Sequence, residues 1–261
     1  MYNLKFLFMA FLALSLFNAC SDDDDGTAPA EDPTPERTGT FTFKFDHGWG
    51  PGHEEFDIGM EKIHPLTQEE ITFSTLRYYV SNIKLYNTDG DVWEEPESYR
   101  IVDAADHDNG EVIFTVDEVP EGSYSSLSFI LGVDSARNTS GAQEGALDPA
   151  ENMFWSWTTG YIFIKAEGES PAAPNGSFSY HIGGFQGEHN AIREIDMDFR
   201  GADLLVNPDA APSAHINVNA ARFWHGRISL EDVHTIHMPG QNAVNIANNM
   251  AGAFRLDHVH R

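Results

Sequence analysis

The chain has 261 residues, with 15 Lys and Arg against 41 Asp and Glu, and a formal net charge of -26. Its content of 41% hydrophobic and 12% aromatic residues can build a core, which excludes a disordered acidic chain. The basic residues are not clustered, which argues against nucleic acid as a partner and favours cations. The single cysteine, Cys20, excludes an intramolecular disulfide and a cysteine zinc cluster, so the 12 histidines are the main potential metal ligands.

The first twenty residues have the pattern of a lipoprotein signal. Lys5 precedes an apolar run, residues 6–17, that is shorter than the roughly 20 residues a membrane-spanning helix needs. Ala19 lies directly before Cys20, as at a lipoprotein processing site. We predict that residues 1–19 are removed and that the lipidated Cys20 anchors the protein to the outer membrane, facing the periplasm or the cell surface. The alternative is an ordinary cleaved signal with an incidental cysteine.

Residues 20–38 predict a disordered acidic tether, because they are rich in acidic residues and proline and contain almost nothing that could pack. The SDDDD run at 21–25 resembles the export tag of surface lipoproteins in Bacteroidetes-type bacteria. The remaining residues, 39–261, keep 13 basic against 34 acidic side chains and show no internal boundary. We therefore expect one folded domain that carries most of the negative charge.

The domain begins with the alternation typical of strands. Phe41, Phe43 and Phe45 alternate with polar residues, which predicts a strand with one buried face. Residues 87–90 have the composition of a hairpin turn. The segments that predict strands are 40–45, 71–73, 76–86, 92–93, 99–102, 112–116, 124–132, 161–166, 176–182, 191–199 and 214–219.

Helical patterns are few and late in the chain. Residues 242–254 carry an apolar stripe at helical spacing after a Pro-Gly start signal, and residues 203–210 and 220–232 are each candidates for a short helix. No long helices alternate with the strands, which argues against a parallel α/β sheet. The fold class that we predict is all-β, an antiparallel β-sandwich with a few short helices mainly near the C-terminus.

Four groups of histidines are candidates for metal binding: His47 with His53, His181, His234 with His237, and His258 with His260. His47 keeps the alternation of the apolar residues in the first strand, so its side chain is predicted to lie on the buried face. If the C-terminal tail is extended, period-2 alternation puts Phe254, Leu256, His258 and His260 on one side, where two imidazoles can share an ion. Each histidine also has a simpler explanation as a solvated or packed side chain.

Several segments together resemble the MbnP-like copper-binding domain family, periplasmic copper proteins first associated with methanobactin systems. They are 131–134 (LGVD), 145–149 (GALDP), 153–161 (MFWSWTTGY) and 165–168 (KAEG), with 78–83 (YYVSNI), 181–183 (HIG) and 257–260 (DHVH) in the order that the family shows. The double-tryptophan string is the most specific. The resemblance spans nearly all of 39–261.

The resemblance implies a β-sandwich that binds one copper ion through histidines. Its implied ligands here are His47, His181 and His258, with His260 as a fourth. Family members are often encoded beside a di-haem cytochrome c peroxidase-like partner, which in some of them oxidises a tryptophan to kynurenine near the metal. Trp155 and Trp157 are the corresponding candidates. Methanotroph members carry a cysteine-containing segment after the central His-x-Gly, where this chain has GFQG at 184–187.

These observations together predict a lipid-anchored copper protein for acquisition or storage. We expect no enzymatic activity, because HExxH, GxSxG, P-loop and GxGxxG motifs are absent from the sequence. An oxidase or hydrolase built on the same histidines is the weaker alternative. The main alternative is a metal-free surface module that holds glycan or protein through exposed aromatic residues, with Trp49, Trp93 and Trp224 as candidates.

Overall fold

The first strand of the domain separates an apolar face from a polar one. In β1 (Thr38–Trp49), Phe41, Phe43 and Phe45 are fully buried, whereas the intervening side chains are partly exposed. The computed structural model describes residues 37–261 except 142, 157 and 227. The predicted signal peptide, Cys20 and most of the tether lie outside the described residues.

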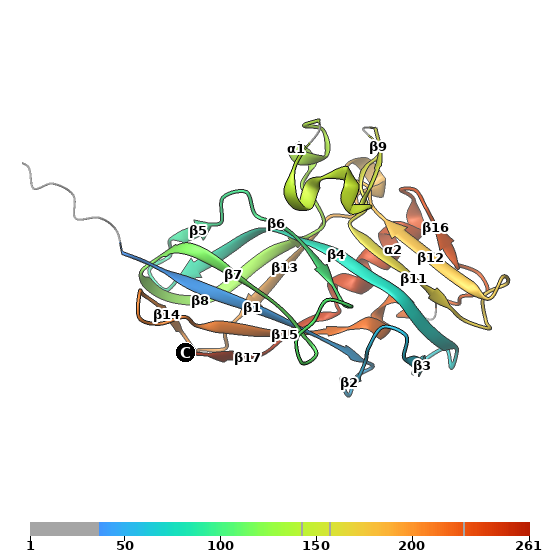
Figure 1. Ribbon diagram of the computed structural model, residues 1–261, viewed down its shortest axis with the longest axis horizontal. Helices are drawn as coiled ribbons and strands as arrows, with labels where there is room; N and C mark the ends of the chain where they lie inside the picture. The colour runs from blue at the N-terminus through green and yellow to red at the C-terminus, as the bar shows by residue number, and fades with distance from the viewer. Residues whose placement is uncertain (1–36, 142, 157, 227) are drawn as a thin grey trace, which may run out of the picture. The chain divides into compact units, whose positions relative to one another are not determined.

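The first sheet has β1 near its centre. β1 pairs in parallel with β15 (Ser213–Asn219) and antiparallel with β7 (Glu111–Pro120) and, at its end, with β2 (Glu54–Glu55). The far side of β15 pairs antiparallel with β17 (Phe254–His260). The order is therefore β17-β15-β1, followed by β7 and β2. Figure 1 shows β1, β15 and β17 running side by side in the lower part of the view.

The second sheet is larger and is built on the long strand β4 (Glu70–Asn87), in the order β13-β8-β4-β11-β12-β16. These strands are β8 (Gly122–Leu131), β11 (Ile164–Glu169), β12 (Ser177–Ile182), β13 (Arg193–Asp198) and β16 (Thr235–Ile236). Further strands pair with β4 or β8: β3 (Glu61–Ile63), β5 (Val92–Glu94), β6 (Tyr99–Asp103) and β14 (Leu204–Val206).

The remaining elements are short, apart from one helix. A small hairpin joins β9 (Phe154–Ser156) and β10 (Gly160–Tyr161). The helices are α1 (Ser135–Asn138), α2 (Gln241–Ala251) and the 3-10 segments η1 (Gly145–Leu147), η2 (Pro149–Glu151), η3 (Gly187–His189) and η4 (Ala220–Trp224). Among the described residues, no helix is both long and apolar enough to cross a membrane.

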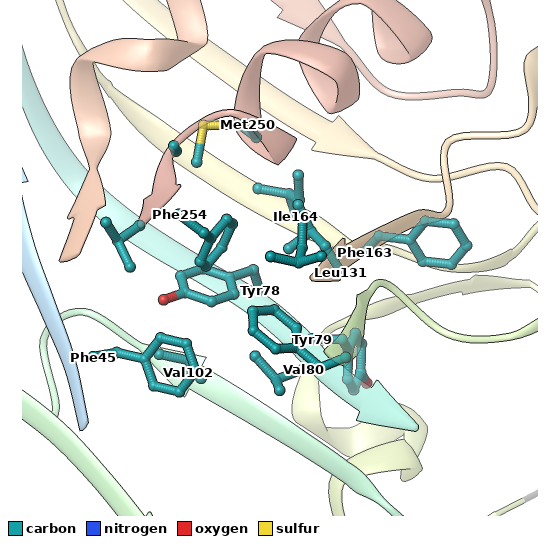
Figure 2. Close-up of a cluster of buried hydrophobic side chains, with 14 of the residues drawn as sticks. Phe45, Tyr78, Tyr79, Val80, Val102, Leu131, Phe163, Ile164, Met250 and Phe254 are labelled. Carbon is teal, nitrogen blue, oxygen red and sulfur yellow. The ribbon is translucent and has the colours of Figure 1, made fainter. Parts of the chain in front are cut away.

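The core lies between the two sheets, as in a β-sandwich. The ring of Phe45 is 6.4 Å from that of Tyr78 on β4 and 6.0 Å from that of Phe129 on β8. Phe254, at the start of β17, packs edge-on against Tyr78 at 5.4 Å and Phe129 at 5.6 Å. Figure 2 shows Phe45, Tyr78 and Phe254 converging from three strands. Aromatic side chains thus tie β17 to both sheets.

The structure confirms the all-β class, and strands occupy the predicted segments. The expectation of a short helix within 203–210 is wrong, since β14 lies there and pairs with β8. The sheets are mainly antiparallel, as predicted, with two parallel pairs, β1–β15 and β12–β16. The helix predicted at 242–254 is α2, which ends at Ala251 with Gly252 as its C-cap, and Phe254 belongs to β17.

Two of the three tryptophans proposed for a surface binding module are not on the surface. Trp49 is 2% exposed and Trp224 is fully buried. Their rings are 6.4 Å apart, and the Nε1 of Trp224 donates to the hydroxyl of Tyr180. Trp49 is buried because it is the last residue of β1, and Trp224 is buried at the end of η4. Only Trp93, on β5, keeps partial exposure.

A β-bulge in β17 changes which side chains of the C-terminal strand face the core. Ile216 of β15 pairs with Leu256 and His215 pairs with His258, so Asp257 has no partner residue. The extra residue reverses the alternation. The prediction that His258 and His260 share a face with Phe254 and Leu256 is therefore wrong: those two apolar residues are buried, and both histidines are exposed.

The aromatic contacts of β17 predict the cost of removing them. We expect Phe254→Ala to lower the free energy of unfolding by about 3–5 kcal/mol, since it leaves a cavity between the two sheets. Urea denaturation would measure this loss. Ile63→Ala, at a side chain that is 58% exposed, should change stability by no more than about 0.5 kcal/mol. Equal losses in the two variants would contradict the packing of Phe254 between the two sheets.

Candidate metal centre

Three histidines meet on the outer face of the first sheet. His215 of β15 pairs with His258 of β17, and their rings stack with centroids 4.1 Å apart. The ring of His260 is 4.7 Å from that of His258 and 4.9 Å from that of His215. One ring nitrogen from each histidine lies within 4.8 Å of the others. Nitrogens bound to one ion at about 2.0–2.1 Å lie at most about 4 Å apart, so the three rings would have to move closer together to hold a metal.

Carboxylates hold two of these rings at their Nδ1 atoms. The Nδ1 of His215 is 2.8 Å from Oε1 of Glu111, and the Nδ1 of His258 is 2.7 Å from Oδ2 of Asp257. A carboxylate accepts the N–H at Nδ1, so Nε2 carries the lone pair that can bind a metal. Carboxylates commonly fix metal-binding histidines in this tautomer and orientation. The bulged Asp257 thus both positions and orients His258.

His215 is the most enclosed member of the cluster. Its Nε2 is buried and has no hydrogen-bond partner among the described residues, which is unusual for a polar atom in a native protein. Burial lowers the pKa of His215, although the charge of Glu111 opposes this effect. The imidazole is therefore kept neutral, the form that binds metal. The Nε2 of His258 lies 3.1 Å from the Nε2 of His260.

His215 was not among the predicted metal ligands. Within 214–219, alternation puts His215 on the other face of the strand from the apolar Ala214 and Ile216. This pattern indicates that its side chain faces outward. Its proximity to His258 depends on the pairing of strands that lie far apart in the sequence. Periodicity gives no information about that pairing.

A second polar group surrounds His181 on the outer face of the other sheet. The Nε2 of His181 is 2.6 Å from Oε1 of Glu167 on β11. The parallel β12–β16 register brings His237 beside His181, with ring centroids 4.6 Å apart. The hydroxyl of Ser179 is 2.8 Å from the Nε2 of His237 and 3.5 Å from that of His181. Two imidazoles and one carboxylate are thus gathered here.

Burial lowers the pKa of His181, although its hydrogen bond to Glu167 opposes this effect. Trp155, one of the two predicted oxidation sites, lies near this group. Its ring is packed so closely on Gly183 that a Cβ there would come within 2.7 Å of it. The indole Nε1 of Trp155 is buried without a hydrogen-bond partner among the described residues. Trp157 lies outside the described residues.

His47 lies apart from both groups, in the core. Its side chain lies on the buried face of β1, as the alternation of the strand predicts, and is 6% exposed. Its Nε2 is 3.0 Å from the hydroxyl of Tyr78. His181, His258 and His260 all lie on outer faces of the sheets, so the structure brings only His258 and His260 together among the four predicted ligands. His53 is also separate, with its Nε2 2.9 Å from Asp46.

The burial of His47 predicts a pH-dependent stability. Burial, and secondarily the charges of His107 and His53, lowers its pKa to about 3 from an ordinary 6.5. Above pH 6.5 His47 is neutral in both states and makes no difference to pH dependence. Below pH 6.5, His47 is protonated in the unfolded state but stays neutral in the folded state. The free energy of unfolding therefore falls by about 1.4 kcal/mol per pH unit down to pH 3.

Urea denaturation of the wild type and His47→Gln at about pH 7 and about pH 5 would measure this contribution. The variant removes the titration, so its loss of stability on acidification should be smaller. His225→Gln, at an exposed histidine, is the control and should follow the wild type. An identical pH dependence in all three proteins would contradict the burial of a neutral His47.

Comparison with known proteins agrees with this architecture. A family model described as MbnP matches residues 38–242. The fold is similar to that of MbnP from Methylosinus trichosporium, with a TM-score of 0.55 and 15% sequence identity, covering 80% of this chain and 87% of that one. No curated protein matches the chain. At this identity the structural likeness shows the fold alone, whereas the family model covers most of the sequence. The chain belongs to the MbnP family.

Proposed function

We propose that this protein binds copper through histidines and serves copper acquisition or storage in the cell envelope. The observation that carries the proposal is the cluster of His215, His258 and His260, in which carboxylates hold two of the three imidazoles at Nδ1. Membership of the MbnP family supports it, because the sequence resemblance associates this family with copper.

The donor set favours copper over other common divalent ions. Imidazole nitrogens suit copper, and the Irving–Williams order places Cu²⁺ above Zn²⁺ at equal ligands. The negative charge of the domain raises the local concentration of any cation. His258 and His260 are exposed at the edge strand β17, so an ion bound there remains accessible to a partner.

The group around His181 is the second candidate for the copper site. Its support is the position of Trp155, since the family resemblance implies an oxidisable tryptophan near the metal, and Trp155 lies on Gly183 just beyond His181. It offers two imidazoles rather than three, together with Glu167. Oxidation of Trp155 or Trp157 by a di-haem peroxidase-like partner stays a prediction.

The remaining parts of the proposal rest on the sequence. The lipoprotein signal supports an outer-membrane anchor at Cys20, and the absence of catalytic motifs supports a binding role without catalysis. A metal-free binding module remains the alternative. Burial of Trp49 and Trp224 weakens it, because those side chains cannot present a flat surface to a glycan.

Copper content tests the site directly. We expect about one copper per chain in the wild type after loosely bound ions are removed, and almost none in His258→Ala/His260→Ala, because a single remaining imidazole cannot hold the ion. Elemental mass spectrometry of the purified protein would measure this. The matched control is His181→Ala/His237→Ala, which removes two imidazoles from the other sheet and should retain copper.

The outcomes separate the candidates. If the control loses copper and His258→Ala/His260→Ala keeps it, the copper site lies at β12. This result would contradict the assignment to the cluster on β15 and β17. Copper absent from the wild type would overturn the proposed function and favour the metal-free module. Far-ultraviolet circular dichroism of each variant would establish that the fold is intact. Both double variants change outward-facing side chains, so neither opens a cavity in the core.

The pH dependence of affinity provides a second test. Imidazole ligands must be neutral, so copper affinity should fall as the pH decreases below roughly 6. Competition with a copper chelator of known affinity at several pH values would measure the change. An affinity that stays constant from about pH 5 to about pH 8 would indicate carboxylate ligands instead.

A further inference from the structure

Basic side chains are paired very unevenly along the described part of the chain. Every described Lys or Arg up to Lys165 forms an ion pair with a carboxylate. The described arginines from residue 193 onward form none: Arg193, Arg200, Arg222, Arg255 and Arg261. In a protein with 41 acidic residues, the guanidinium groups without a carboxylate partner keep a positive charge that is available to an anion.

Two of these arginines line the same pocket. It has a volume of about 230 Å³ and lies on the outer face of the first sheet, between the 50–53 loop and the segment that leads into β17. Arg255 projects from β17 beside Asn217 of β15, its partner in the register. Arg200 reaches the pocket from the turn after β13, and its Nη2 donates to the carbonyl of Leu256 at 3.0 Å.

The hydrogen-bonding capacity of the pocket is largely unused. The guanidinium of Arg255 has no partner among the described residues, and Arg200 uses one of its five donors on Leu256. Asn219 also lines the pocket and accepts two backbone N–H bonds at Oδ1, from Gly50 and Ala221, which leaves its amide N–H₂ free. These groups are donors, so they are suited to an acceptor with negative charge.

The acidic groups near the pocket have other partners. Asp257 lines the pocket, but its Oδ2 is 2.7 Å from the Nδ1 of His258. Asp46 lies on the same sheet face, one strand beyond Asn217, and is bound by His53. Neither carboxylate forms an ion pair with Arg200 or Arg255. The two guanidinium groups therefore keep their charge available.

We infer that this pocket is an anion site in which Arg200 and Arg255 bind a carboxylate or phosphate group of a small molecule. Guanidinium groups match the planar geometry of carboxylates and the oxygens of phosphate. The volume is below the roughly 300–1,000 Å³ of pockets for drug-sized ligands, which limits the ligand to a small oxyanion such as phosphate or citrate. The site is separate from the histidine cluster and does not require metal.

Calorimetric titration of the metal-free protein with inorganic phosphate, and separately with citrate, tests the inference. We expect at least one of them to bind, and Arg255→Gln and Arg200→Gln each to weaken that binding by about tenfold or more, since each removes charge-assisted hydrogen bonds. Arg261→Gln is the matched control. It removes an exposed arginine that also lacks an ion pair but lies outside the pocket, and it should bind like the wild type.

Several results would overturn the inference: no binding of either anion by the wild type, binding unchanged in Arg255→Gln and Arg200→Gln, or an equal loss in Arg261→Gln. The last would indicate a general effect of net charge. Binding of phosphate alone or citrate alone identifies the oxyanion class. Because the titration uses metal-free protein, failure of the copper proposal would not change its outcome.

Discussion

The one-residue bulge at Asp257 is the constraint on which the candidate metal centre depends. Without it, the alternation that buries Phe254 and Leu256 would carry His258 and His260 into the core. Burying two unpaired imidazoles would be costly. With the bulge, β17 keeps its aromatic contacts at one end and presents both histidines outward at the other. The residue that shifts the register also supplies the carboxylate that orients His258.

Local pattern predicted much of the fold and only part of the site. Alternation identified the strands and the buried phase of His47, because both depend on neighbouring residues alone. Neither the parallel pairing of β1 with β15 nor the bulge has a local signal, and both are needed to bring His215 against His258. The resemblance to a known family named His47, His181 and His258 as ligands, but the structure places these three side chains on different faces.

The position of His47 gives it a part in folding that is distinct from metal binding. It occupies the inner face of β1 in line with three buried phenylalanines, and the hydroxyl of Tyr78 meets its Nε2. A neutral imidazole is tolerated there because this hydrogen bond satisfies one of its nitrogens. Protonation would place a charge among aromatic rings. The inner face of β1 therefore makes the stability of the fold depend on pH, whereas its outer face lies beside the proposed metal ligands.

The candidate metal centre and the proposed anion pocket are distinct, but both lie on the outer face of the first sheet, and Asp257 contacts both. Its carboxylate accepts from His258 and also lines the pocket of Arg200 and Arg255. A metal ion on Nε2 of His258 would make the N–H at Nδ1 a stronger donor and hold Asp257 against the imidazole. The arginines would then face less competition from that carboxylate for an incoming oxyanion. By thermodynamic reciprocity, an anion in the pocket would favour the metal-bound form of His258 to the same degree.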